Sequence, residues 1–392
     1  MKDNQAKYPQ LRFKGFTDPW EQRKLGEIFN YEQPTKYIVK STEYDDNFNT
    51  PVLTAGKSFL LGYTDEISGI KNATVENPVV IFDDFTTGSH YVDFPFKIKS
   101  SAMKLLSLND NSDNFYFMFN TLKNIKYVPQ SHERHWISKF SSFEIYKPSQ
   151  EEQQKIGSFF KQLDATIALH QRKLAKLKEL KQGYLQKLFP RNGSKFPQLR
   201  FAGFADAWEE RKLTDVTSSY SGLTYSPTDV QDKGTFVLRS SNVKNDQLVD
   251  ADNVYVNPDI VNSNNVKVGD VIVVVRNGSR SLIGKHAIII KEMPNTVIGA
   301  FMSAFRGQNG HYINALLSTN NFQKEVHKSL GATINQITGK DFSMMNFLTP
   351  KLEEQSKIGS FFKQLDDTIA LHQRKLEKLQ ELKKGYLQKM FC

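Results

Sequence analysis

Residues 151–189 read EEQQKIGSFFKQLDATIALHQRKLAKLKELKQGYLQKLF, and residues 353–391 read EEQSKIGSFFKQLDDTIALHQRKLEKLQELKKGYLQKMF. The two stretches are 202 residues apart and differ at six of their 39 positions. A shared fold alone does not require such close identity. The sequence therefore divides into two halves, each of which ends in a copy of the same segment.

Each copy has the pattern of one long helix. Apolar residues recur at alternating steps of four and three, which is the a/d repeat of a coiled coil, and strong helix formers fill most other positions. At about 1.5 Å per residue, such a segment forms a helix of roughly 58 Å. Because each helix carries a narrow apolar stripe, we expect the two helices to bury their stripes against each other in an intramolecular coiled coil. The predicted seam consists of Ile156, Phe160, Leu163, Ile167, His170, Leu174, Leu177 and Tyr184 in the first helix and Ile358, Phe362, Leu365, Ile369, His372, Leu376, Leu379 and Tyr386 in the second.

Each predicted seam contains one histidine near its middle, His170 in the first helix and His372 in the second. A polar residue in an apolar seam commonly fixes the register of the two helices. No cysteine or carboxylate stands at metal-ligand spacing around either histidine. We therefore predict a role in register and no metal site.

A second repeat opens each half of the chain. Residues 9–25, PQLRFKGFTDPWEQRKL, return at residues 197–213 as PQLRFAGFADAWEERKL. The layout is opener, insert and helix, twice, as expected of a tandem duplication with pseudo-twofold symmetry. We predict four segments: a first globular domain over 1–148, a long helix over 149–189, a linker and second globular domain over 190–350, and a long helix over 351–392.

The two inserts between opener and helix differ in sequence, and both predict an α+β domain. Short apolar runs bounded by turn residues predict strands, and longer periodic runs predict helices. In the first insert we expect strands at 78–82 and 94–98 and a helix at 113–123. In the second we expect strands at 235–238, 270–275 and 286–290 and a helix at about 311–329.

Chain length, cysteine content and net charge limit the class of protein. A chain of 392 residues suits two domains with connecting elements. Its single cysteine is Cys392, which excludes an internal disulfide framework. Without an apolar run near 18 residues or a signal-like N-terminus, we expect a cytoplasmic protein. The net charge of +10 indicates a polyanionic partner only weakly, because the two long helices carry six of these charges.

Motifs for catalysis are absent from the sequence. Residues 54–58, TAGKS, resemble the end of a phosphate-binding loop, but Pro51 stands where its first glycine should be. The two histidines of residues 132–135, HERH, are three apart, which differs from the HExxH zinc motif. No GxGxxG fingerprint occurs. We therefore expect no catalytic residue, no metal site and no cofactor bound by this chain.

Several presumed loops instead combine hydrogen-bonding, cationic and aromatic side chains. Arginine can grip guanine in a bidentate manner, asparagine and glutamine can grip adenine, and hydroxyl groups suit phosphate. Each such loop taken singly is more often a solvated turn. The DNA-binding candidates are Thr87, Ser89, His90, Tyr91, Ser131, His132, Arg134, His135 and Trp136 in the first insert and Arg239, Ser240, Asn242, Arg276, Asn277, Ser279, Arg280, Thr333, Asn335 and Gln336 in the second.

This arrangement resembles the specificity subunit of type I restriction-modification systems, and the resemblance spans essentially the whole chain. It is carried by residues 148–156, PSQEEQQKI, by residues 350–358, PKLEEQSKI, and by the openers that end in WEQRKL and WEERKL. The resemblance implies two target-recognition domains that are spaced by an antiparallel coiled coil. It implies no catalytic activity in this chain.

The same resemblance implies the partners. These are double-stranded DNA, two methyltransferase subunits that bind S-adenosylmethionine, and restriction subunits that hydrolyse ATP with magnesium. Because the two inserts differ, each should read a different half-site of an asymmetric bipartite target. In this frame residues 131–136 and 331–336 occupy comparable places before the two helices, and residues 85–91 are the counterpart of residues 276–280.

Two other classes of protein remain open at this point. A scaffold that presents two ligand-binding modules on a coiled coil, without DNA specificity, would explain the helices and the missing catalytic motifs equally well. Near identity of the helices favours two equivalent surfaces for two copies of one partner, although recent duplication would also preserve it. A self-sufficient nuclease or methyltransferase lacks any supporting motif.

Overall fold

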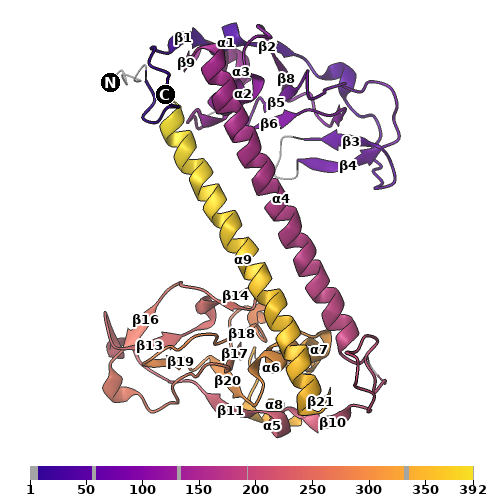
Figure 1. Cartoon of the computed structure of the whole chain (residues 1–392), viewed down its shortest axis with the longest axis vertical. Coiled ribbons are helices and arrows are strands. Elements are labelled where there is room, and N and C mark those ends of the chain that lie inside the picture. Colours follow the sequence, from indigo (N-terminus) through magenta and orange to yellow (C-terminus); the bar gives the residue numbers. More distant parts are fainter. Residues whose placement is uncertain (1–7, 55–58, 130–133, 192, 331–334, 392) are drawn as a thin grey trace. The chain divides into compact units, whose positions relative to one another are not determined.

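The computed structural model describes residues 8–54, 59–129, 134–191, 193–330 and 335–391. The chain forms two compact units, one of Met1–Gln171 with Arg374–Cys392 and one of Arg172–Gln373. Each unit therefore holds one globular domain together with part of both long helices, α4 (Gln150–Leu188) and α9 (Leu352–Met390) (Figure 1). The α+β class is confirmed, and the two predicted helices are present within two residues of their expected ends.

Local sequence explains where the long helices begin and end. Pro148 and Pro350 stand two residues before the two helices begin. The residue before a proline is disfavoured in the helical conformation, so neither helix extends back past its proline. Acidic residues fill both first turns, and a lysine stands in both last turns. This placement complements the helix dipole at either end.

Within each unit the segments of α4 and α9 pair antiparallel. In the first unit Phe159 packs edge-on against Tyr386 at 5.1 Å between ring centroids, and Lys383 Nζ lies 2.5 Å from Asp164 Oδ1. In the second unit the equivalent residues of the duplicated sequence make the same contacts, Tyr184 with Phe361 at 4.9 Å and Lys181 with Asp366 at 2.8 Å. The residues of the predicted seam are all buried or half-buried.

The described residues of the first unit's domain form three small sheets and three short α-helices. A four-stranded antiparallel sheet has the order β2-β8-β5-β6, and a three-stranded sheet has the order β4-β3-β7 with β3 and β7 parallel. The elements are β1 (Glu21–Lys24), α1 (Leu25–Ile28), β2 (Phe29–Glu32), β3 (Thr50–Leu53), β4 (Leu60–Thr64), β5 (Val79–Asp83), β6 (Ser89–Val92), β7 (Lys97–Ile98), β8 (Met103–Leu108), α2 (Phe115–Asn124), α3 (His135–Ser138) and β9 (Glu144–Lys147).

The predicted elements of this domain are largely present. Strand β5 has four consecutive buried residues, as expected of a strand covered on both faces, and it lies in the middle of its sheet. The helix expected at 113–123 is α2. The strand expected at 94–98 is wrong in extent, because only Lys97 and Ile98 pair with a neighbouring strand and Pro95 interrupts the segment.

A cluster of ion pairs surrounds Glu32, the last residue of strand β2. Glu32 accepts hydrogen bonds from Tyr37 Oη at 3.0 Å and Lys71 Nζ at 2.6 Å, and Lys36 Nζ lies 2.7 Å away. Burial alone would raise the pKa of Glu32, but the hydrogen bonds from Lys36, Lys71 and Tyr37 outweigh it and lower the pKa from 4.5 to about 2. This carboxylate therefore favours the folded state at neutral pH.

The domain of the second unit repeats the same plan. Its antiparallel sheet has the order β11-β20-β17-β18, and its mixed sheet has the order β12-β16-β13-β19 with β13 and β19 parallel. The elements are β10 (Glu209–Lys212), α5 (Leu213–Val216), β11 (Ser218–Ser221), β12 (Val230–Gln231), β13 (Thr235–Leu238), β14 (Val243–Lys244), β15 (Gln247–Leu248), β16 (Val254–Val256), β17 (Val271–Val274), β18 (His286–Ile288), β19 (Thr296–Ile298), β20 (Met302–Arg306), α6 (Gly310–Leu317), α7 (Asn320–Ser329), α8 (Gly339–Met344) and β21 (Asn346–Thr349).

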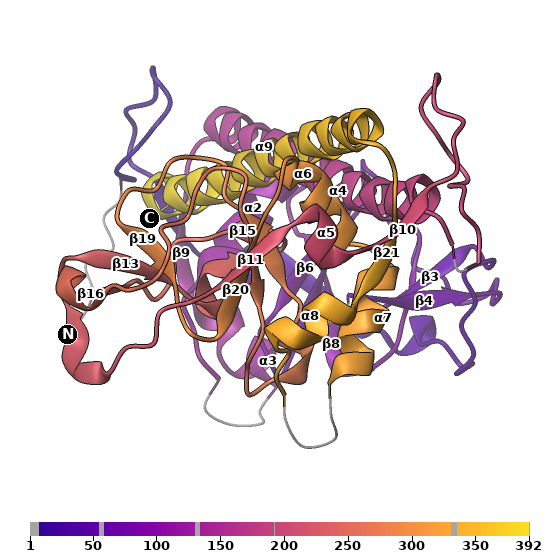
Figure 2. The ribbon, with the colours of Figure 1, turned by 90° about the horizontal axis from the view of Figure 1, so that it is seen from below.

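One helix predicted in this domain is two helices. The expected helix at 311–329 breaks between α6 and α7, and Figure 2 shows α6 beside α9. The Thr319 side chain accepts a hydrogen bond from Phe322 N and so caps α7, and a capping threonine has non-helical backbone angles. The strands expected at 235–238, 270–275 and 286–290 are β13, β17 and β18.

Each opener fastens its domain to both long helices. Arg12 makes a bidentate ion pair with Glu152 at the start of α4, with both contacts at 2.7 Å, and Leu11 N donates to Lys389 O at the end of α9. In the second unit Arg200 pairs with Glu354 in the same way, and Leu199 N donates to Lys187 O. The residues that the two openers share therefore make the same attachment in both units.

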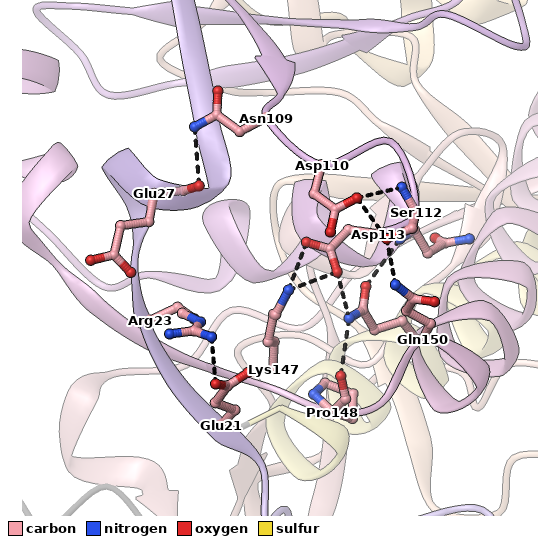
Figure 3. A network of polar contacts seen from close by, with 12 residues as sticks. Glu21, Arg23, Glu27, Asn109, Asp110, Ser112, Asp113, Lys147, Pro148 and Gln150 are labelled. Carbon is pink, nitrogen blue, oxygen red and sulfur yellow. Dashed lines mark hydrogen bonds and ion pairs between the residues drawn. The ribbon is translucent and has the colours of Figure 1, made fainter.

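A buried polar network anchors the start of α4 in the first unit (Figure 3). Lys147 Nζ donates to both carboxylate oxygens of Asp113 at 2.9 Å. Gln153 Nε2 donates to the same carboxylate at 2.9 Å and to Pro148 O at 3.0 Å. The carboxylate of Asp113 is thus satisfied by a strand residue and a helix residue at once, which joins β9 to the long helix.

Two glycines let the domains approach the long helices closely. Asn114 caps α2 by accepting from Phe117 N at 2.9 Å, and a Cβ on Gly157 would lie 2.7 Å from Asn114 Cγ. In the second unit Asn309 caps α6, and a Cβ on Gly359 would lie 2.6 Å from Asn309 Oδ1. A side chain at either glycine would have to displace the capping asparagine.

In the described part of the chain, none of the helices has the length and apolar character needed to span a membrane.

Candidate nucleic-acid interface

In the first unit, Asp84 joins two of the segments predicted to contact DNA. This residue follows the central strand β5, and its backbone carbonyl accepts from His135 N at 3.1 Å. Its Oδ1 accepts from Trp136 N at 2.9 Å, and its Oδ2 lies 3.3 Å from Lys104 Nζ. Both members of the Asp84–Lys104 pair are almost fully buried. The pair therefore holds the start of α3 against the end of β5.

Two candidates in this unit are wrong as direct DNA contacts. The side chains of His135 and Trp136 are 0% and 1% exposed. Trp136 packs edge-on against Phe29 and Phe82 in the hydrophobic core, where burying an aromatic ring is strongly favourable. The composition of residues 131–136 predicted a DNA-binding loop, but the Trp136 ring packs in the core and holds α3 against it.

Most of the other described candidates of the first unit lie nearer the surface. Arg134 is exposed, and the His90 ring stacks on Phe59 with 4.4 Å between centroids. Thr87 has a φ of 59°, which places it in the left-handed region at the tip of the turn between β5 and β6. Ser89 is mostly buried, and burial together with nearby Asp93 raises the pKa of Tyr91 to about 12.

In the second unit three separate stretches of candidates meet. Arg276 forms an antiparallel bridge with Gln336, and Asn335 Nδ2 donates to Gly278 O at 3.3 Å. Asn277 Nδ2 donates to Ser240 Oγ at 3.2 Å, which brings in the third stretch. Residues about 40 and 60 positions apart in sequence thus form one polar surface. In the first unit Asp84 takes the place of Val275, the residue before Arg276, because Asp84 O accepts from His135 N at 3.1 Å and Val275 O accepts from Ile337 N at 2.8 Å.

Arg276 is held on an aromatic ring. Its guanidinium carbon lies 5.1 Å from the ring centroid of Phe301, a half-exposed residue of the same unit. This cation–π contact orients an exposed arginine whose planar donors match guanine or phosphate. Arg280 instead donates to Leu330 O at 3.2 Å, and Ser279 shares a hydrogen bond with Ser281.

Asn242 is also wrong as a DNA contact. Its side chain is 0% exposed, its Oδ1 accepts from Arg239 N at 2.9 Å, and its Nδ2 donates to Ala251 O at 2.6 Å. The amide is satisfied inside the domain and fixes the turn after β13. Three further candidates, Ser131, His132 and Thr333, lie outside the described residues.

The arrangement of side chains in both units suits the recognition of a nucleic acid. Among the described residues, no group of three or more His, Cys, Asp and Glu side chains could hold a metal ion. The exposed groups are guanidinium, amide and hydroxyl donors on turns that a rigid sheet positions. Such side chains can bind base edges and phosphates.

The comparison with protein families decides the class. The family described as the type I restriction modification DNA specificity domain matches residues 17–179 and, a second time, residues 205–381. The chain belongs to this family. The resemblance seen in the sequence is thereby confirmed, and the match favours DNA specificity over a scaffold without it.

Individual members of the specificity family are similar over most of this chain. The EcoR124I/EcoR124II specificity subunit of Escherichia coli is 30% identical over 358 residues, which cover 87% of this chain and 85% of that protein. The MjaVIII specificity subunit of Methanocaldococcus jannaschii is 22% identical over 392 residues, which cover 94% and 91%.

A solved structure shares the fold of the family. The crystal structure of the S subunit of a type I restriction-modification system from M. genitalium matches with a TM-score of 0.72 at 15% identity, covering 98% of this chain and 99% of that one. At this identity the likeness concerns the fold alone.

Sequence analysis missed several residues that shape these specificity domains. Asp84 and Lys104 stand in ordinary strand and loop contexts, and Phe59 and Phe301 are single aromatics far in sequence from their partners. Phe301 carried one usable signal, a large aromatic side chain directly after Gly299-Ala300. The others depend on strand pairing that no local pattern reveals.

Proposed function

We propose that this chain is the specificity subunit of a type I restriction-modification complex and that each globular domain reads one half of an asymmetric bipartite DNA target. The observation that carries the proposal is the contrast within the repeated units. The parts that attach each domain to the helices are almost identical, as in Arg12–Glu152 and Arg200–Glu354. The turns after strands β5 and β17 differ, beginning with Asp84 and Phe85 in one domain and with Val275 and Arg276 in the other.

The duplicated helices support a second part of the proposal, docking of two methyltransferase subunits. A helix that only separates two domains tolerates drift on its outer face. Two equivalent surfaces for two copies of one partner would keep their side chains, and only six of 39 positions differ between the copies. In this proposal the methyltransferase subunits bind S-adenosylmethionine, restriction subunits use ATP with magnesium, and this chain itself is non-catalytic.

The complex acts on double-stranded DNA, which places the protein in the cytoplasm of a bacterial or archaeal cell in this proposal. Because the recognition turns of the two domains differ, the two half-sites differ in sequence. The helices set the number of unread base pairs between them.

Methylome sequencing tests the proposal. Cells carrying this gene and its cognate methyltransferase gene are compared with cells in which only this gene is deleted. The expected result is loss of one bipartite methylated motif, which also delivers both half-sites. An unchanged methylome, with the methyltransferase subunit confirmed by immunoblot in both strains, would contradict the proposal and favour a scaffold without DNA specificity.

A further inference from the structure

The second unit contains a largely apolar pocket beside the polar surface formed by Ser240, Asn277 and Asn335. The pocket has a volume of about 680 Å³ and lies between the segment before β12, the turn after β13 and the loop between β19 and β20. Its walls include Leu223, Tyr225, Arg239, Ser241, Phe301 and Met302. Pockets of this size are typical of sites that enclose a small ligand.

The pocket and the proposed DNA surface share residues. Ser240 lines the pocket and also accepts the hydrogen bond from Asn277 Nδ2 at 3.2 Å. Phe301 lines the pocket and carries the guanidinium of Arg276 on its ring at 5.1 Å. DNA that contacts Arg276 and Asn277 therefore lies at the opening of the pocket.

Two residues that line the pocket carry unsatisfied donors just behind its wall. Among the described residues, neither Arg239 Nε nor Ser241 Oγ has a hydrogen-bond partner, although both atoms are buried. The Arg239 guanidinium donates from Nη2 to Asp252 O at 2.7 Å. A buried donor without an acceptor is costly. A ligand that supplies an acceptor, with a small shift of these side chains, would remove that cost.

The charge of the lining selects between the parts of DNA. Arg239 and Asp252 both line the pocket and carry opposite charges, so the lining has no excess positive charge to attract an anionic phosphate. A neutral base needs no such charge. Tyr225 and Phe301 supply aromatic rings on which a base can stack, and the carbonyl and ring nitrogen atoms of a base are acceptors for the unsatisfied donors.

We propose that this pocket receives one base of the bound DNA, unstacked from the duplex, with Phe301 at its entrance and Arg239 and Ser241 as hydrogen-bond donors. The inference rests on the proposed function of the chain. It assigns Phe301 a contact with the base, whereas Arg276 beside it contacts the base edges or phosphates of the duplex.

The test uses the full complex of this chain with its methyltransferase subunit and duplexes that carry the methylated motif. In each duplex one base pair of the second unit's half-site or of the adjoining spacer is altered. One nucleotide of that pair is replaced by an abasic residue, which leaves the other base unpaired. An unpaired base is easier to extrude, so binding should tighten about tenfold at one position. The methylated base is set aside, because methyltransferases extrude that base themselves. Affinity is measured by fluorescence anisotropy, and 2-aminopurine at the sensitive position should brighten on binding.

Two variants make the test specific to the pocket. Phe301→Ala should abolish the tenfold gain in affinity and the 2-aminopurine signal. Because the Phe301 side chain is half-exposed, we expect this variant to fold. Ile290→Ala removes an exposed apolar side chain that does not line the pocket and should change neither. Specific binding without a gain at any position, or a gain that survives in Phe301→Ala, would overturn the inference alone. Equal binding to the motif and to a scrambled duplex would overturn the proposed function with it.

Discussion

Gly157 and Gly183 stand on the same long helix, and replacing either with alanine should have opposite effects. A Cβ on Gly157 would lie 2.7 Å from Asn114 Cγ and 3.1 Å from Phe117 N, whereas nothing described lies within 4 Å of a Cβ on Gly183. Asn114 caps α2 and also donates to Gln154 Oε1 at 2.7 Å. A methyl group at position 157 must therefore push the cap away from the helix.

The magnitudes follow from three contributions. Alanine stabilises a helix interior by about 1 kcal/mol relative to glycine. Losing an asparagine cap costs about 1 kcal/mol, and forcing a methyl group into a packed contact costs about 1–3 kcal/mol. Gly157→Ala should therefore destabilise the protein by about 1–3 kcal/mol, and Gly183→Ala should stabilise it by about 1 kcal/mol. In a unit of this size 1 kcal/mol shifts the melting temperature by about 2–4 °C.

Urea unfolding followed by circular dichroism measures both variants, and hydrogen exchange of the α2 amides locates the change. Protection of α2 should fall in Gly157→Ala and stay unchanged in Gly183→Ala. The duplicated helix supplies a second pair, because Gly359 meets Asn309 Oδ1 at 2.6 Å and Gly385 has no described neighbour within 4 Å. Equal shifts of one sign for Gly157→Ala and Gly183→Ala would refute the reasoning that close approach of the cap fixes the domain on the helix.

Three further outcomes are expected. Glu32→Gln should reduce the acid-induced loss of the free energy of unfolding. In the wild type the stabilisation from the lowered pKa of Glu32 is complete above about pH 4.5 and is lost as the pH falls toward 2. The free energies of unfolding of the two proteins, measured with urea across this range, should therefore converge near pH 2, and a constant difference between them would contradict the prediction. Arg134→Ala and Arg276→Ala should each weaken discrimination in a different half of the methylated motif, by about 1–3 kcal/mol, with the other half as internal control; methylome sequencing showing changes in the same half would count against separate reading. Deleting one heptad from both long helices should shorten the preferred spacer by about three base pairs, since seven residues rise about 10 Å; an unchanged spacer in the methylome would show that helix length does not set it.

Much of the architecture could be predicted because its causes are local or repeated. The long helices follow from a heptad pattern carried by each segment alone, and the strands at β5, β13 and β17 follow from short buried runs. The break at Thr319 was missed, because a capping side chain competed with a continuous helical pattern. The short extent of β7 was missed, because an alternating pattern does not reveal which residues find a partner strand.

The candidate site was predicted less well, since exposure depends on distant parts of the chain. Arg276, Asn277 and Asn335 were correctly expected near the surface, but nothing in their sequence context indicated that they meet Ser240. His135, Trp136 and Asn242 have the composition of a recognition loop and are nevertheless buried. A polar or aromatic residue in a loop can face the core as readily as the solvent, and only the packing around it distinguishes the two.

The sequence alone determined the duplicated plan, the two α+β domains, the long helices and the family, because repeats, periodicity and motifs are properties of the chain read in order. Tertiary structure alone decided which recognition segments meet, how each domain clasps the helices through Arg12 and Arg200, and where the pocket beside Phe301 lies. The physical reason is that these features come from pairing between strands and side chains far apart in sequence. Such pairing is selected by the packing of the whole domain and not by any local preference.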